Sequence, residues 1–223
     1  MNVVMSSFGF VVVGEAPAEG YRNVLITGLG RSGTSAIASV LRNAGFYLGD
    51  VENISTREDP ALREMLRKGQ INEILTLLAD WAASHPLIAW KEPKLVGNEG
   101  RQLVCGLPDD WAVIVVFRDP LARAVRLVTE HGGDLMTTLV ESIRLPNKLV
   151  QLVQETQKTT LLLSYEKHVT KPIDVCQDLL SVLVPKLTLG IDVPALWNKT
   201  RMDQSMYQEH AERKRRKEFS RQA

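Results

Sequence analysis

The sequence has little cysteine, little net charge and no long apolar run, and each absence excludes a class of protein. Its two cysteines, Cys105 and Cys176, are far apart and match no Cys/His spacing of a zinc site, which disfavours a disulfide scaffold and a zinc site. No stretch reaches the roughly 18 apolar residues of a membrane span, and no Lys or Arg precedes Arg22 to begin a signal peptide. We therefore expect a cytoplasmic protein with no transmembrane span.

The composition is that of an ordinary globular protein. Hydrophobic residues make up 44% and charged residues 24% of the 223 positions, which excludes a disordered or fibrous chain. This length predicts a single domain, 1–223, with a basic segment at 201–223 that carries seven Lys and Arg against four acids. The run 213–217 offers cations to nucleic acid, anionic lipid or a nucleotide phosphate. Because no aromatic residues are interleaved with it, we favour a solvated helix end and expect no nucleic-acid partner.

Short apolar runs alternate with longer stretches of helical periodicity. Strands are predicted at 8–13, 24–27, 87–90, 112–117 and 159–163. Helices are predicted at 34–43, 60–83, 121–131, 134–157 and 169–184, and Pro146 is expected to interrupt the fourth. Continuous apolar strands separated by helices indicate an α/β fold with a P-loop-like, doubly wound parallel sheet flanked by helices. Ligands of such sheets bind beyond the carboxyl ends of the strands, where this chain has the polar segments 28–35, 91–94, 118–119 and 164–166.

The segment 28–35 has the features of a phosphate-binding loop. It reads Gly-Leu-Gly-Arg-Ser-Gly-Thr-Ser between a predicted strand and a predicted helix. Glycines let backbone N–H groups turn inward, and a helix N-terminus favours an anion. A nucleoside-triphosphatase loop would have Lys where Thr34 stands, so the cation of this loop is Arg31. We predict phosphate contacts from Gly30, Arg31, Ser32, Gly33, Thr34 and Ser35.

Four short motifs together resemble sulfotransferases that use 3′-phosphoadenosine 5′-phosphosulfate (PAPS). Arg-Ser-Gly-Thr at 31–34 is similar to the family's 5′-phosphosulfate loop, in the form seen in the tyrosylprotein branch. Phe-Arg-Asp-Pro at 117–120, followed by Arg123-Ala124, looks like the family's 3′-phosphate element. Trp-Lys-Glu-Pro-Lys at 90–94 is similar to the Lys-Asp-Pro-Arg segment of the bacterial and tyrosylprotein enzymes, and Ser-Tyr-Glu at 164–166 to the family's late Tyr-Glu. The resemblance covers residues 23–172.

The resemblance implies transfer of a sulfuryl group from PAPS to a hydroxyl or amine, with adenosine 3′,5′-diphosphate as product and no metal. Such a reaction needs in-line positioning and stabilisation of charge on the leaving phosphate. Arg31 would neutralise that phosphate, and Lys91 would add a second cation unless it forms a surface ion pair with Glu92. Arg118 would bind the 3′-phosphate, and Tyr165 would contact the adenine or the phosphate end, or pack at the strand end.

Two positions depart from the family pattern. Eight residues after the strand-end Arg, where the family usually has Ser, this chain has Arg126, which either clamps the 3′-phosphate or lies on a solvated helix. None of the four histidines falls in the motif that supplies the general base of many relatives. The tyrosylprotein branch uses a Glu shortly after the first helix, which makes Glu52 the first candidate base and Asp50 the second. Both are equally compatible with solvated loop acids.

Two other classes of function remain open. A P-loop kinase for a small molecule would use the glycine loop with Asp119 as a magnesium ligand, although the loop lacks its Lys. A non-catalytic nucleotide-binding relative would have this fold without the enzymatic activity. The acceptor is unidentified, and a small molecule, a saccharide, a lipid headgroup or a peptide all fit. We expect its site between the segments 50–83 and 134–157.

Overall fold

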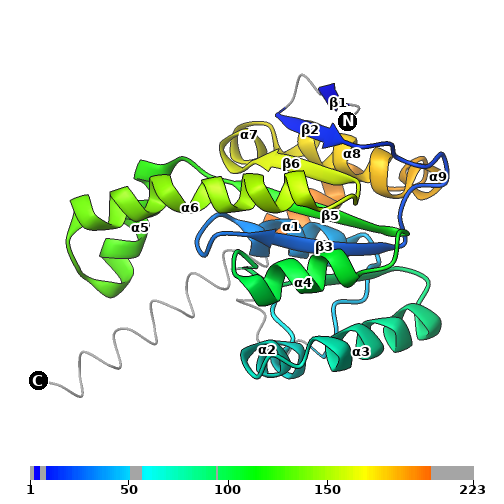
Figure 1. Ribbon diagram of the computed structural model, residues 1–223. Coiled ribbons are helices and arrows are strands. Elements are labelled where there is room, and N and C mark those ends of the chain that lie inside the picture. Colours follow the sequence, from blue (N-terminus) through cyan, green and yellow to red (C-terminus); the bar gives the residue numbers. More distant parts are fainter. Residues whose placement is uncertain (1–2, 6–8, 51–56, 94, 202–223) are drawn as a thin grey trace, which may run out of the picture.

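A mixed, six-stranded sheet organises the described part of the chain. The computed structural model describes residues 3–5, 9–50, 57–93 and 95–201. The strands run in the order β1-β2-β6-β5-β3-β4 (Figure 1). Their bounds are β1 (Val3–Met5), β2 (Phe10–Val13), β3 (Asn23–Gly28), β4 (Ile88–Lys91), β5 (Trp111–Phe117) and β6 (Thr160–Ser164).

The four central strands are parallel, as the continuous apolar runs predict. Asn23 of β3 pairs with Ile88 of β4 on one side and with Trp111 of β5 on the other. At the far end of the strands, Phe117 of β5 pairs with Ser164 of β6. The carboxyl ends of these strands therefore meet at one edge of the sheet, and the predicted α/β fold with a doubly wound parallel sheet is confirmed.

The first two strands extend this parallel sheet in the antiparallel direction. β2 pairs with β6, and Phe10 lies opposite Leu163. β1 pairs with β2, again antiparallel. The sequence predicts a strand at 8–13 but carries no signal for its direction, because pairing with β6 joins segments from opposite halves of the chain.

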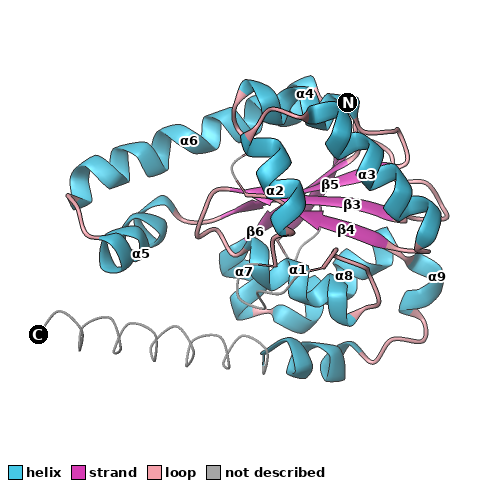
Figure 2. Ribbon diagram, turned by 90° about the horizontal axis from the view of Figure 1, so that it is seen from below, coloured by secondary structure: helices cyan, strands magenta, loops and turns pink. Residues whose placement is uncertain are grey.

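Helices cover both faces of the sheet (Figure 2). Along β5, Ile114 and Val116 face a core that contains α1 (Thr34–Asn43) and α8 (Pro172–Leu183), whereas Val113 and Val115 face the opposite core. The opposite core contains residues of α2 (Pro60–Arg67), α3 (Ile71–Ser84), α4 (Asn98–Gly106) and α6 (Leu135–Glu155). The alternation follows from the two-residue period of a strand.

Helix boundaries differ from the predicted ones at several places. The helix expected at 60–83 is broken into α2 and α3 by a turn at 68–70, where Gly69 has a φ of 70°. The interruption expected at Pro146 is wrong, since α6 is continuous over 21 residues. A proline removes a single N–H donor, and the other turns of this long helix hold it together. The helix expected at 169–184 is α7 (Tyr165–Thr170) and α8, because Pro172 begins a new helix.

Other helices had no clear signal in the sequence. α4 is short and polar at its start, so its periodicity is weak. α9 (Pro185–Thr188) is a single turn, and the segment 193–201 is also helical. Within the described residues, we find no helix with the length and apolar character that crossing a membrane requires.

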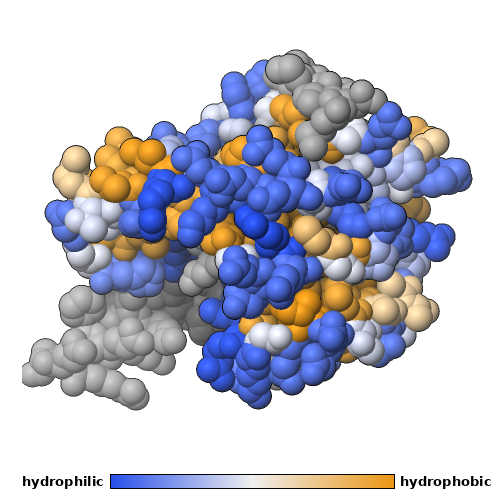
Figure 3. All heavy atoms as spheres, viewed as in Figure 1, coloured by the Kyte–Doolittle hydropathy of each residue, from blue (hydrophilic) through white to orange (hydrophobic). Residues whose placement is uncertain are grey.

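α5 (Pro120–His131) and α6 form a hairpin that extends beyond the sheet (Figure 1). Apolar side chains are exposed on this hairpin, and Figure 3 shows apolar surface over it. Met136, Val140 and Ile143 of α6 are each more than half exposed, at 64%, 59% and 56%. Their spacing places them on one face of α6.

Candidate phosphate-binding site

The strand order creates a topological switch point beyond β3 and β5. β4 and β5 lie on opposite sides of β3, so the connections after β3 and β5 lead away from each other. Such a switch point is where doubly wound sheets bind ligands. The predicted phosphate loop follows β3 at this point, and Arg118 follows β5.

Three glycine and arginine positions give the loop its shape. Gly33 has a φ of 94°, and a Cβ there would come within 2.1 Å of the Tyr165 ring. A Cβ at Gly28 would come within 2.7 Å of the Val116 carbonyl oxygen. Arg31 itself has a φ of 71°, a conformation that non-glycine residues rarely adopt and that is concentrated at functional sites. Glycine at 28 and 33 therefore lets the loop approach both β5 and Tyr165.

Two arginines of the strand-end element hold the backbone of this loop. Arg118 Nη1 donates a hydrogen bond to the carbonyl oxygen of Arg31, with a separation of 2.8 Å. Arg123 Nε donates to the carbonyl oxygen of Gly30 at 3.0 Å, and Arg123 Nη1 donates to Ser142 Oγ of α6 at 2.7 Å. Burial lowers the pKa of Arg123. The loop is thus attached to the α5–α6 hairpin through two of its carbonyl groups, and within the loop the Ser32 N–H donates to the Leu29 carbonyl oxygen at 3.0 Å.

The late Tyr-Glu segment also reaches this edge. The Arg118 guanidinium lies 4.7 Å above the centre of the Tyr165 ring. The backbone N–H of Asp119 donates to Glu166 Oε1 at 2.9 Å. Segments that follow β3, β5 and β6 therefore lie in contact, as their positions at strand ends predict.

Several polar groups of the loop suit an anion. Ser32 is 1% exposed, and its hydroxyl has no hydrogen-bond partner in the described part of the chain. Gly33 begins α1 without a capping side chain, so the first turn of that helix has backbone N–H groups to offer. Thr34 is buried at the same turn. A phosphate oxygen would satisfy these donors, and this fit is the observation that favours a phosphate ligand.

The predicted cations Arg31 and Arg126 converge on one carboxylate. Arg31 Nη2 lies 2.5 Å from Glu130 Oε2, and Arg126 Nε forms an ion pair with the other oxygen of Glu130. Arg126 therefore does not lie on a purely solvated face, and it reaches toward the loop. Glu130 was not found from the sequence, because a single acid on an amphipathic helix carries no signal.

Lys91 lies on the other side of β3, in a separate buried ion pair. Its side chain is 3% exposed, and Nζ is 2.6 Å from Glu58 Oε1. Arg63 Nη1 binds the other oxygen of Glu58 at 2.8 Å. Burial lowers the pKa of Lys91, and the Glu58 carboxylate opposes this shift. The alternative, a surface ion pair with Glu92, is wrong because Lys91 is buried and does not lie at the surface. Glu58 is an ion-pair partner that the sequence did not predict.

Of the two candidate bases and the candidate magnesium ligand, the structure describes Asp50 and Asp119. Glu52 lies outside the described residues. Asp50 is exposed, and its backbone N–H donates to Asp59 Oδ2 at 3.2 Å. Asp119 Oδ1 accepts from the N–H of Ala122 at 2.7 Å and so caps α5. Among the described residues, no cluster of three or more His, Cys, Asp or Glu side chains could hold a metal ion.

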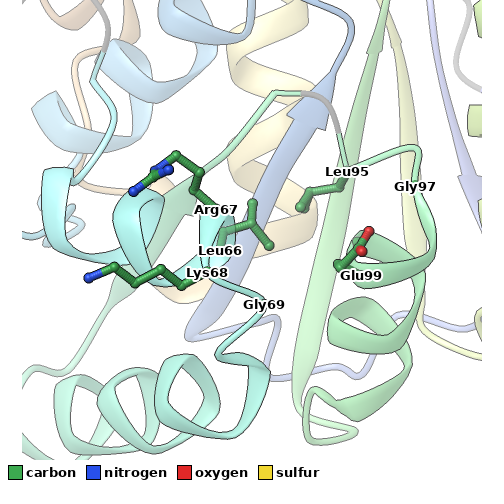
Figure 4. Close-up of a pocket in the computed structure, with 8 residues that line it drawn as sticks. Leu66, Arg67, Lys68, Gly69, Leu95, Gly97 and Glu99 are labelled. Carbon is green, nitrogen blue, oxygen red and sulfur yellow. The ribbon is translucent and has the colours of Figure 1, made fainter.

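A cavity of about 420 Å³ lies between the end of α2 and the start of α4 (Figure 4). Leu66 and Leu95 contribute apolar surface, Glu99 lies at the α4 side, and Arg67 and Lys68 point away. Residues 66–69 line one side of this cavity, and residues of the segment 95–100 line the other.

The fold defines the class of protein: a doubly wound α/β protein of P-loop-like architecture. No protein-family model and no curated protein matches the chain. A sulfotransferase from Alicyclobacillus acidocaldarius has a TM-score of 0.49 at 15% identity, covering 77% of this chain and 81% of that one. A sugar kinase from Janibacter sp. HTCC2649 has a TM-score of 0.44 at 19% identity, covering 79% and 98%.

A second sulfotransferase, from Mycobacterium tuberculosis H37Rv, has a TM-score of 0.43 at 12% identity, covering 82% of this chain and 77% of that one. Sulfotransferases and a kinase thus both occur among the similar structures.

Proposed function

We propose that the protein is a sulfotransferase that moves a sulfuryl group from PAPS to a hydroxyl or amine of an acceptor. The observation that carries the proposal is the loop at the switch point. Its cation is Arg31, its carbonyl groups are held by Arg118 and Arg123, and its Ser32 hydroxyl is buried without a partner in the described chain. This arrangement offers N–H donors, a hydroxyl and a guanidinium to a phosphate, which is what the donor requires.

The proposed reaction needs three things from these residues. The acceptor oxygen or nitrogen attacks sulfur while the bond from sulfur to the 5′-phosphate oxygen breaks, and adenosine 3′,5′-diphosphate leaves. Arg31 neutralises the charge that develops on the leaving phosphate. Lys91 is the second cation in this proposal, and Arg118 with Arg126 receives the 3′-phosphate. Tyr165, which lies next to Gly33 and under Arg118, contacts the nucleotide in this proposal.

The acceptor's proton needs a base, and Glu52 remains our first candidate. Replacing Glu52 by Gln should lower turnover by about 10²–10⁴-fold while donor affinity is unchanged, because base catalysis contributes on that scale. Asp50→Asn is the matched variant at the neighbouring acid. A loss below tenfold at Glu52 would transfer the assignment to Asp50 if that variant loses activity.

The kinase alternative has less support from this site. Its magnesium ligand would be Asp119, whose carboxylate caps α5, and its loop lysine would stand where the chain has Thr34. A non-catalytic relative would bind nucleotide without turnover.

For location, we propose the cytoplasm, since Cys105 and Cys176 are both free thiols and suit a reducing compartment.

Calorimetric titration without magnesium tests the donor. Adenosine 3′,5′-diphosphate should bind more tightly than adenosine 5′-phosphate, and magnesium with ATP should bind weakly. Preference for magnesium-ATP would favour the kinase instead. Turnover with labelled PAPS against a panel of saccharides, lipids and small alcohols or amines then identifies the acceptor, and nucleotide binding without turnover would favour the non-catalytic relative.

A further inference from the structure

The last turn of α5 places a carboxylate between the two arginines of the site. Glu130 Oε2 contacts Arg31 Nη2 at 2.5 Å, and the second oxygen pairs with Arg126 Nε. His131 Nε2 lies 4.0 Å from Glu130 Oε2. We call the arrangement of Arg31, Arg126 and Glu130 the Glu130 bridge.

The three side chains of the Glu130 bridge are buried to different extents. The Glu130 side chain is 5% exposed, whereas Arg31 is 35% and Arg126 is 44% exposed. A nearly buried carboxylate has to be compensated by cations, and here both compensating guanidinium groups extend to solvent. The same two guanidinium groups would repel each other if no anion lay between them.

The loop can keep its place when Arg31 leaves Glu130. Its backbone is held by Arg118 at the Arg31 carbonyl and by Arg123 at the Gly30 carbonyl, and neither bond uses the Arg31 side chain. The Arg31 guanidinium can therefore turn to another anion without disrupting the loop. The ion pair with Glu130 is a contact that a ligand can replace.

We infer that Glu130 is an internal anion that occupies the position of a ligand oxygen pair between Arg31 and Arg126, and that an anionic ligand must displace it. The two oxygens of Glu130 each contact a different guanidinium, and two oxygens of a phosphate can bridge the same pair of guanidinium groups. Glu130 thereby lowers the affinity of the site and keeps its two cations together while no ligand is bound. That the ligand is PAPS rests on the proposed function, whereas the competition itself requires only an anion.

The test compares Glu130→Gln with Glu155→Gln, a matched variant that removes one negative charge from α6, where Glu155 forms an exposed ion pair with Arg101 of α4. Dissociation constants are measured by calorimetry for inorganic pyrophosphate and for adenosine 3′,5′-diphosphate. Glu130→Gln should bind both about three- to tenfold more tightly than the wild type, because two partly exposed ion pairs no longer compete. Glu155→Gln should match the wild type.

Equal or weaker binding by a folded Glu130→Gln protein would overturn the inference, because a residue that only positions the arginines would lose affinity when neutralised. Tighter pyrophosphate binding without preference for the nucleotide would support the Glu130 bridge and contradict the PAPS assignment. If the wild type prefers the nucleotide and Glu130→Gln binds neither ligand more tightly, the result would support the PAPS assignment and contradict the Glu130 bridge. Should Glu130→Gln fail to fold, Glu130→Asp withdraws the carboxylate by one methylene, and an affinity gain below about twofold would then count against the inference.

Discussion

The backbone and the side chain of Arg31 have separate roles. The Arg31 carbonyl oxygen accepts a hydrogen bond from Arg118, and the Arg31 guanidinium belongs to the Glu130 bridge. Arg31→Ala keeps the carbonyl and removes only the cation, so the loop should stay in place. We expect turnover to fall by about 10²–10³-fold, the scale of losing one donor to developing negative charge.

The matched variant for Arg31→Ala is Arg42→Ala, which removes an exposed arginine from the last turn of α1. Steady-state turnover with labelled PAPS and thermal unfolding are measured for both. Unchanged turnover in a folded Arg31→Ala protein would contradict the role of the loop cation. An equal loss in Arg42→Ala would show that the assay responds to net charge and not to the site.

Lys91 requires a different design because it is buried against Glu58. Lys91→Met leaves the Glu58 carboxylate with Arg63 as a remaining partner and should cost about 3–5 kcal/mol of unfolding free energy. A double variant, Lys91→Met with Glu58→Gln, removes both charges and should recover most of that stability. If Lys91 acts on the leaving group, turnover stays low in both proteins while donor affinity is kept. Recovery of turnover together with stability would assign Lys91 a structural role.

At the scale of elements, the turn from β3 into α1 leaves little room for a side chain at Gly33. Gly33 and Gly45 both have positive φ, 94° and 100°, but only Gly33 has a neighbour, the Tyr165 ring. Gly45→Ala should cost about 1–2 kcal/mol from backbone conformation alone. Gly33→Ala should cost about 1–3 kcal/mol more, because the new methyl group overlaps Tyr165.

Chemical denaturation of these two alanine variants gives the difference directly. Donor binding should weaken in Gly33→Ala and stay at the wild-type value in Gly45→Ala. Equal unfolding free energies would show that Tyr165 moves away without cost. That result would contradict a fixed position of the Tyr165 ring against the loop.

The sequence predicts the central elements because their signals are local. The buried runs of β3 and β5 are continuous, and each precedes polar residues that the parallel register brings to one edge. Glu58 and Glu130 could not be predicted, since each pairs with a cation from a distant segment, and in the sequence Glu58 looks like an ordinary acid before a helix and Glu130 like an ordinary acid on one. Arg123 lay in a recognised motif, but its bond to the Gly30 carbonyl depends on how α5 docks.

Across the whole molecule, His168 connects stability to pH. It is buried in a T-shaped contact with Trp197 in the segment 193–201, and burial lowers its pKa to about 4 from 6.5. The unfolded chain therefore binds more protons than the native protein between these values. The stability that His168 contributes is complete above pH 6.5 and falls as the pH approaches 4, by up to about 3 kcal/mol.

Unfolding free energies of the wild type and His168→Phe at several pH values test this expectation. The difference between the two curves should change across that window, because carboxylate titration is common to both. His131→Gln, which removes an imidazole from a side chain that is 63% exposed, is the control. A constant difference for His168→Phe would contradict the expectation.

The attachment of the loop to the α5–α6 hairpin has a thermodynamic consequence. Arg118 and Arg123 join the loop's carbonyl groups to the start of α5, and Arg123 continues to Ser142 on α6. A molecule that binds the exposed apolar face of the hairpin and shifts it would therefore also shift the loop. By linkage, whatever factor such a molecule imposes on donor affinity, the donor imposes on the affinity of that molecule in return.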